Sequence, residues 1–146
     1  GLVLPVSLIR RDTLPEGERA MSEQTARQVR GMLEQAVSRD GTGTAAQVAY
    51  YRVGGKTGTA HKLVNGEYAN NSYIASFAGF APASNPRLVM IVTVDEPQGG
   101  AYFGGQVAAP VFSKVMAGAL RLLNIPPDNL DGPARRTAGL GREGVT

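Results

Sequence analysis

Several residue types that often carry chemistry are scarce or absent in this 146-residue sequence. There is no cysteine, which excludes a disulfide framework, thiolate catalysis and the usual structural zinc site. The single histidine, His61, cannot form a metal centre by itself, so we expect no metal site. Tryptophan is missing, only 6% of the residues are aromatic, and no apolar run approaches the length of a membrane span.

Charge and composition favour an ordinary globular domain without a nucleic-acid partner. The net charge is +3, and the arginines are scattered rather than gathered on a basic helix with interleaved aromatic residues. A hydrophobic content of 42% is enough for a core, and this length makes one domain or part of a larger one. The sequence starts at Gly1 without a methionine, so we expect a piece of a longer protein.

Two segments have apolar residues at helical spacing. Ser22 is typical of a helix N-cap, and the periodicity after it predicts an amphipathic helix to about Ser38 that covers a sheet face. Pro110 suits a first helical turn, and the pattern after it predicts a second helix that ends near Asn124. Residues 2–9 are apolar and predict an extended segment or an edge strand.

Three strands are predicted between these helices, over residues 54–64, 73–82 and 88–94. Asn65-Gly66 is a hairpin-turn signal, whereas residues 67–71 are polar and are expected to lie outside the strands. Short connections between successive strands predict an antiparallel meander. Residues 88–94 are nearly all apolar or β-branched, which is typical of a central strand covered on both faces.

The glycine-rich stretch at residues 54–60, Gly-Gly-Lys-Thr-Gly-Thr-Ala, has two mechanistic interpretations. In a phosphate-binding P-loop, a glycine would stand five positions before Gly55, and a helix would follow the lysine. Tyr50 occupies that position and the stretch runs on to a hairpin turn, so the P-loop is excluded. The second interpretation is a Lys-Thr-Gly strand that lines an acyl-transfer site at an accessible sheet edge.

Each residue of this motif would have a task in acyl transfer. Lys56 would supply positive charge for a substrate carboxylate. Thr57 and Thr59 would offer hydroxyl donors, and Gly58 would leave space for substrate against the strand. On a regular strand both threonines face away from Lys56, unless a twist or bulge near Gly58 intervenes. Lys-[Ser/Thr]-Gly is expected by chance in about one chain in fifteen of this length, so the motif needs support from the rest of the sequence.

Further motifs supply that support, because their order resembles the transpeptidase domain of class B penicillin-binding proteins, in particular the cell-division (septal) type. After residues 54–60 come Ser-Phe-Ala-Gly-Phe-Ala-Pro at 76–82, Asn-Pro-Arg at 85–87, Val-Asp-Glu-Pro at 94–97, Tyr-Phe-Gly-Gly at 102–105 and Ala-Pro-Val-Phe at 109–112. The resemblance implies an α/β (α+β) fold of the penicillin-binding protein and serine β-lactamase type, an antiparallel sheet flanked by helices. Residues 1–127 would be the C-terminal part of the domain. Residues 128–146 turn to glycine, arginine and small polar residues, which predicts a flexible tail.

The resemblance also implies an activity, a location and partners. A serine would attack the D-Ala-D-Ala end of a peptidoglycan stem peptide, and the acyl group would pass to an amine of a neighbouring stem. β-Lactam antibiotics would acylate the same serine. The enzyme would act at the division septum, on the periplasmic face of the bacterial inner membrane, with other cell-division proteins and without a cofactor.

The same resemblance assigns roles to seven residues. Lys56 would be the catalytic cation, and the N–H of Thr59 would be one oxyanion donor. His61 would contact substrate at the cleft rim, with a plain surface position as the alternative. On a glycine-rich loop over residues 97–105, Tyr102 and Phe103 would form an apolar wall over bound side chains, or would anchor their loop on the core. The expected substrate contacts are Thr57, Gly58, Thr59, His61, Tyr102 and Phe103.

Two parts of the family's active site are absent from this sequence. None of the three lysines has a serine three positions before it, and no asparagine has a serine two positions before it. We therefore expect Ser-x-x-Lys and Ser-x-Asn on an upstream part of the same domain, and predict that this chain alone is inactive toward β-lactams. A serine β-lactamase or β-lactam sensor domain, and a non-catalytic binding fragment of that fold, stay open as alternatives.

Overall fold

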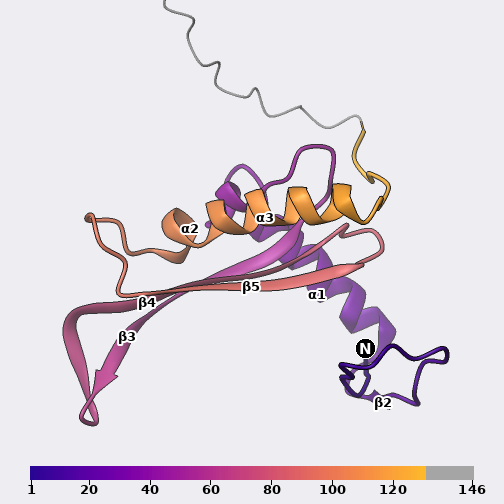
Figure 1. The fold of residues 1–146 in the computed structure, drawn as a ribbon, viewed down its shortest axis with the longest axis horizontal. Coiled ribbons are helices and arrows are strands. Elements are labelled where there is room, and N and C mark those ends of the chain that lie inside the picture. Colours follow the sequence, from indigo (N-terminus) through magenta and orange to yellow (C-terminus); the bar gives the residue numbers. More distant parts are fainter. Residues whose placement is uncertain (131–146) are drawn as a thin grey trace, which may run out of the picture.

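A three-stranded antiparallel sheet forms the centre of the structure, a computed structural model that describes residues 1–130 (Figure 1). Asn65 and Gly66 turn the chain between the first two strands with φ angles of 54° and 87°, the conformation that an Asn-Gly pair adopts in a two-residue hairpin. The predicted meander is confirmed, since the strands pair in the order β3 (Gly54–Val64), β4 (Glu67–Ala81) and β5 (Leu88–Asp95).

The strand β4 begins earlier than the sequence predicts, because residues 67–71 belong to it rather than to a polar connection. The β3–β4 pairing shifts register between His61 and Leu63 and then continues to the turn, with Leu63 opposite Tyr68. This end of the hairpin extends beyond the helices in Figure 1, and Leu63 and Tyr68 are 60% and 73% exposed. Polar residues are tolerated there because backbone pairing, rather than burial, holds the two strands together.

The strand β5 lies at an edge of the sheet among the described residues, which corrects the prediction of a central strand covered on both faces. Its side chains alternate. Met90 and Val92 pack against the core, whereas Val89 and Ile91 are 81% and 69% exposed on the opposite face. The apolar composition of β5 suits cover on both faces, but within residues 1–130 it has cover on one. A hydrophobic pattern does not reveal which segment supplies the second layer.

The two long helices meet this sheet differently: the C-terminal one lies over one face, whereas the N-terminal one contacts the sheet chiefly through its edge strand β3, and Val37 is its only buried residue (Figure 1). The first predicted helix is confirmed as α1 (Glu23–Val37), and the Ser22 Oγ caps it by accepting a hydrogen bond from the N–H of Thr25 at 3.0 Å. The second is confirmed as α3 (Ala109–Leu122). A short helix, α2 (Gly104–Val107), was not expected, since its start falls in the predicted glycine-rich loop. None of the helices in residues 1–130 combines the length and apolar character that a membrane crossing requires.

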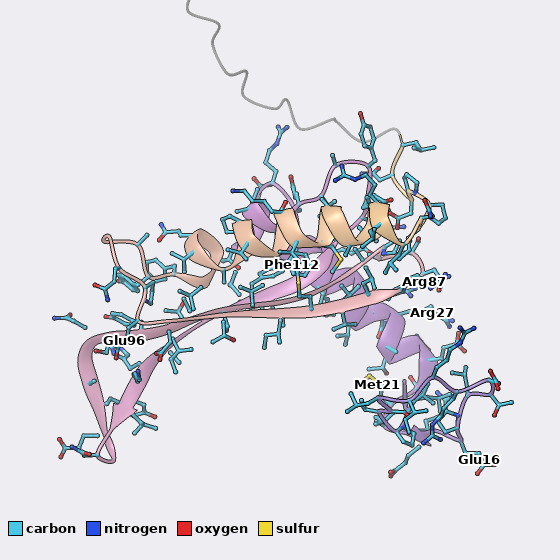
Figure 2. The ribbon with its side chains drawn as sticks, viewed as in Figure 1. Glu16, Met21, Arg27, Arg87, Glu96 and Phe112 are labelled. Atoms are coloured by element: carbon cyan, nitrogen blue, oxygen red, sulfur yellow. The ribbon has the colours of Figure 1, made fainter. Side chains whose placement is uncertain are left out.

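The core lies between α3 and the sheet. Figure 2 shows Phe112 pointing from α3 toward the strands, and its ring lies 4.8 Å from that of Phe77 on β4, at 64°. Both side chains are fully buried, and an edge-to-face pair of this kind adds about 0.5–1.5 kcal/mol to the stability that burial supplies. A Cβ atom at Gly55 would lie 2.5 Å from the Phe77 ring. The glycine before Lys56 is thus required by packing, and the core fixes the position of β3.

The N-terminal segment forms only a small paired structure. The strands β1 (Leu2–Val3) and β2 (Glu18–Arg19) pair antiparallel, so two residues of the extended segment predicted over 2–9 form a strand. Figure 2 places Glu16 and Met21 in this segment, at the end of the molecule near the start of α1.

Contacts at the other end reach past residue 127, where the sequence suggests that the folded domain ends. The Asp128 carboxylate accepts hydrogen bonds from the backbone N–H of Arg52 at 2.7 Å and of Ser84 at 3.1 Å. The N–H of Asn129 donates to the carbonyl of Tyr50 at 3.0 Å. Residues 131–146, the remainder of the predicted tail, lie outside the described residues.

Candidate functional site

The predicted motif lies on β3, at an open edge of the sheet as the structure describes it. Lys56 is exposed, and its Nζ donates to the carbonyl of Thr57 at 2.9 Å and to the Thr57 Oγ1 at 3.1 Å. The pairing of β3 with β4 is regular from Gly54 to His61, so no bulge near Gly58 changes the alternation of faces. The edge position therefore allows the long side chain of Lys56 to reach Thr57.

The two threonines of the motif line a groove of about 410 Å³ between β3, α2 and the loop after α1. The Thr57 Oγ1 lies 3.1 Å from the Thr42 Oγ1. The Thr59 Oγ1 accepts a hydrogen bond from the N–H of Gly104, also at 3.1 Å. The fold thus brings the motif together with the start of α2. The groove is lined mainly by small and hydroxyl residues: Thr42, Thr44, Ala45, Thr57, Thr59, Phe103, Gly104, Gly105 and Gln106.

Close packing explains two of the glycines at this site, Gly104 against backbone and Gly58 against a side chain. A Cβ atom at Gly104 would lie 2.1 Å from the carbonyl oxygen of Ser76 and 2.4 Å from that of Gly58, so only glycine lets α2 begin this close to the sheet. A Cβ atom at Gly58 would lie 2.5 Å from the Ser76 Oγ. Gly58 therefore makes room for a neighbouring side chain, a reason that the sequence did not suggest and that does not depend on a substrate.

Four rings form a continuous row beside the groove. His61 lies 4.7 Å from Tyr73, Tyr73 stacks on Tyr102 at 4.3 Å with 17° between the planes, and Tyr102 lies 4.4 Å from Phe103. The His61 Nδ1 is 3.3 Å from the carbonyl oxygen of Ala69. Tyr102 is anchored on the sheet through Tyr73, whereas Phe103 is 51% exposed at the groove. Tyr102 thus anchors its loop, whereas an apolar wall formed by Phe103 over bound side chains stays a prediction.

Sequence reasoning missed several residues of this site, among them Tyr73, Thr42 and Gln106. Tyr73 could have been found, because it lies four residues before Phe77 on a strand and therefore on the same face. Thr42 and Gln106 have no such signal. Their position depends on how the loop after α1 and the start of α2 fold back over β3.

A charge cluster holds the hairpin where it leaves the sheet. The Lys62 Nζ lies 3.0 Å from both the Asp95 Oδ2 and the Glu96 Oε1. Figure 2 shows Glu96 at this end of the sheet. Hydrogen bonds to Glu96 and then to Asp95 raise the pKa of Lys62. The two carboxylates are exposed and Lys62 is half-buried, and the cluster joins β3 to the end of β5.

Comparisons with known proteins identify the family. Residues 1–117 match the family described as penicillin binding protein transpeptidase domain, and this chain belongs to that family. The resemblance that the motifs suggested is thereby confirmed. The probable peptidoglycan D,D-transpeptidase PenA of Neisseria meningitidis serogroup A is 50% identical over 127 residues, which cover 87% of this chain. The peptidoglycan D,D-transpeptidase FtsI of Escherichia coli K12 is 44% identical over 131 residues, which cover 89% of it.

A solved structure supports the fold. The transpeptidase domain of penicillin-binding protein 3 from Burkholderia pseudomallei, in its apo form, matches with a TM-score of 0.79 and 51% sequence identity. The match covers 88% of this chain and 39% of that domain, and the predicted fold class is confirmed. The chain spans 22% of the length of each of the two curated relatives named above.

Proposed function

We propose that this chain forms one wall of the active site of a serine D,D-transpeptidase, which cross-links peptidoglycan stem peptides at the division septum and is acylated by β-lactams. The observation that carries the proposal is that Thr57 and Thr59 line one groove beside β3 while the Lys56 Nζ, at the open edge of that strand, donates a hydrogen bond to the Thr57 Oγ1. Family membership and the names of the relatives support the reaction class. The enzyme would act on the periplasmic face of the inner membrane, held by an anchor outside these residues.

The hydrogen bonds that the two threonines accept from Lys56 and Gly104 leave their hydroxyl protons unused. A hydroxyl has one proton and two lone pairs. The Thr57 Oγ1 accepts from Lys56, and the Thr59 Oγ1 accepts from the N–H of Gly104, so neither contact uses the hydroxyl proton. A carboxylate in the groove could accept from both O–H groups while Lys56 offsets its charge. The site therefore suits the terminal carboxylate of a stem peptide or of a β-lactam.

The backbone of β3 supports the oxyanion role proposed for Thr59. The carbonyl of Thr57 accepts a hydrogen bond from Lys56, which indicates that it is directed to the open edge. In an antiparallel strand, alternate residues direct their N–H and C=O groups to the same side. The N–H of Thr59 would therefore point to that edge, where it can donate to the oxygen on which negative charge develops.

In the proposed reaction, the oxygen of a serine forms an ester with the carbonyl carbon of the penultimate D-Ala. The bond to the terminal D-Ala breaks, and its nitrogen takes up a proton as it leaves. The amine of a neighbouring stem peptide then attacks the ester, forms the new peptide bond and returns a proton to the serine oxygen. A β-lactam would undergo the same attack, with its ring amide opening to leave an acyl-enzyme.

We propose that the serine comes from an upstream part of the same domain, which carries Ser-x-x-Lys and Ser-x-Asn. Two features of the chain support a partner of this kind. The side chains of Val89 and Ile91 leave an apolar sheet face exposed, and β3 presents an open strand edge beside the groove. The upstream part would cover the first and face Lys56 across the second. Other cell-division proteins would be partners of the complete enzyme.

A chimeric domain tests the proposal. This chain replaces the matching segment of the Burkholderia pseudomallei transpeptidase domain, and the product is incubated with a fluorescent penicillin and separated by denaturing electrophoresis. We expect a labelled band at the mass of the chimeric domain. A chimeric domain that is folded by circular dichroism but unlabelled, while the Burkholderia domain labels, would contradict the proposal. Rapid loss of the label would instead favour the β-lactamase alternative.

The Lys56→Ala variant tests the proposed catalytic role of the Lys56 charge. Removing the charge beside the groove should slow labelling by about a hundredfold or more, the usual loss when a group that stabilises transition-state charge is deleted. Lys114→Ala is the matched control, because Lys114 is exposed on α3, away from the groove. Equal labelling rates for the two variants would remove Lys56 from the mechanism.

A further inference from the structure

The loop between α1 and the short 3-10 helix Thr44–Ala46 brings a residue outside every recognised motif to the groove. The Thr42 Oγ1 lies 3.1 Å from the Thr57 Oγ1, fifteen positions along the chain. A Cβ atom at Gly105 would lie 2.3 Å from the carbonyl oxygen of Thr42, so the start of α2 packs directly on this loop. The backbone of Thr42 is therefore held against the start of α2, within reach of Thr57.

The loop does not need that hydroxyl to hold its own shape. The N–H of Gly43 donates to the carbonyl of Ala36 at 2.9 Å, and the Thr44 Oγ1 donates to the carbonyl of Gly41 at 2.6 Å. These bonds use the backbone and Thr44. Removing the hydroxyl of Thr42 would leave them in place, so the bond to Thr57 calls for another explanation.

The hydrogen-bonding capacity of the Thr57 hydroxyl suggests an explanation for its bond to Thr42. Its Oγ1 has two lone pairs, and the Lys56 Nζ, which can only donate, occupies one of them. With the groove empty, the Thr57 proton can be donated to Thr42. When a carboxylate binds, that proton can turn to the ligand, and the Thr42 hydroxyl can rotate to donate into the second lone pair of Thr57. Thr42 thus supplies a partner for either orientation.

We propose that Thr42 is a positioning residue for ligands with a carboxylate: it holds the Thr57 Oγ1 and donates to it when the Thr57 proton turns into the groove. This inference rests on the proposed function, since it assumes that the groove takes the carboxylate of an acyl donor. It makes Thr42 a determinant of selectivity for carboxylate-bearing ligands, acting through Thr57 and not on the reacting atoms.

The test compares two ligands on variants of the chimeric domain. Acylation is measured with a penicillin and with its methyl ester, which has the same ring but no carboxylate. Thr42→Val removes the hydroxyl at nearly constant shape and should lower the acylation efficiency with the acid by about fivefold, the effect of one neutral hydrogen bond. The acylation rate of Thr42→Val with the ester should stay within a factor of two of the parent. Thr42→Ser should restore the acylation efficiency with the acid.

A second variant separates positioning from damage to the loop. Thr44→Val removes the hydroxyl that bonds the loop carbonyls, so it should lower the acylation rates with acid and ester alike. If Thr42→Val behaves like Thr44→Val, or if the acid rate is equal for Thr42→Val and Thr42→Ser, Thr42 has no positioning role although the proposed function stands. If the unsubstituted chimeric domain is not acylated at all, both the function and this inference are wrong.

Discussion

The hydrogen bond between Thr59 and Gly104 should be measurable as local stability, and Thr59→Val is the perturbation that removes it. The Thr59 Oγ1 accepts the N–H of Gly104 at 3.1 Å, and Gly104 is buried where α2 meets the sheet. Valine has nearly the shape of threonine but no acceptor. In the variant, the N–H of Gly104 loses its side-chain partner at a position that is partly buried and lines the groove.

The magnitude follows from that loss. Losing one partly buried hydrogen bond costs about 0.5–1.5 kcal/mol, and this cost lowers the free energy of local opening at the start of α2. Since about 1.4 kcal/mol is a factor of ten, the amide of Gly104 should exchange about 2- to 12-fold faster in the variant. The amides of α1 should keep their rates.

Amide exchange of the chimeric domain, followed by mass spectrometry on peptides that span residues 102–108, measures this change. Thr59→Ser is the matched control, because it keeps an oxygen that can accept from Gly104. The reasoning is refuted if Thr59→Val leaves exchange in this segment unchanged. It is refuted equally if Thr59→Ser accelerates exchange as much as valine does, since the acceptor would then be irrelevant.

Three further predictions concern the surroundings of the site. Gly104→Ala places a Cβ within 2.4 Å of two backbone carbonyls and should slow penicillin labelling of the chimeric domain by about tenfold or more. Gly118→Ala is the control, because a Cβ there has nothing within 4 Å, and equal labelling rates for the two variants would contradict the close packing. Lys62→Gln should lower the unfolding temperature at neutral pH. The pKa of Lys62 is raised above its ordinary value of 10.5, so its stabilising contribution is complete below pH 10.5 and is lost as the pH rises through the raised pKa. If the difference in unfolding temperature between the parent and the variant does not shrink over that pH range, the ion pairing is contradicted. Residues 1–146 expressed alone should self-associate in sedimentation and take up no fluorescent penicillin; a soluble monomer with well-protected strand amides would argue against the upstream partner, and a labelled band would place a nucleophile in this chain.

The sequence by itself determined most of the secondary structure, because the signals are local. The alternation and turn chemistry around Asn65-Gly66 predict the β3–β4 hairpin, and Ser22 and Pro110 mark the starts of the long helices. The motif order also indicated the family. These patterns depend on neighbours within a few residues, where propensity, capping and period act directly.

The strand β5 shows where that kind of evidence stops. Residues 88–94 are apolar enough for a buried central strand, yet the structure leaves Val89 and Ile91 exposed. The apolar composition of a strand indicates that burying its surface is favourable. It does not record whether this chain or another segment covers that surface, because burial is a property of the assembled layers.

The site itself was decided by tertiary structure. Lys56 and Thr57 could be selected from the motif, but the contact of Thr57 with Thr42 and that of Thr59 with Gly104 join segments 15 and 45 residues apart. Hydrogen bonds between residues so far apart along the chain leave no periodic pattern in the sequence. They exist because glycines at positions 104 and 105 let the start of α2 approach the backbone of β3 and β4 and the loop at Thr42, and that approach is a matter of packing in three dimensions.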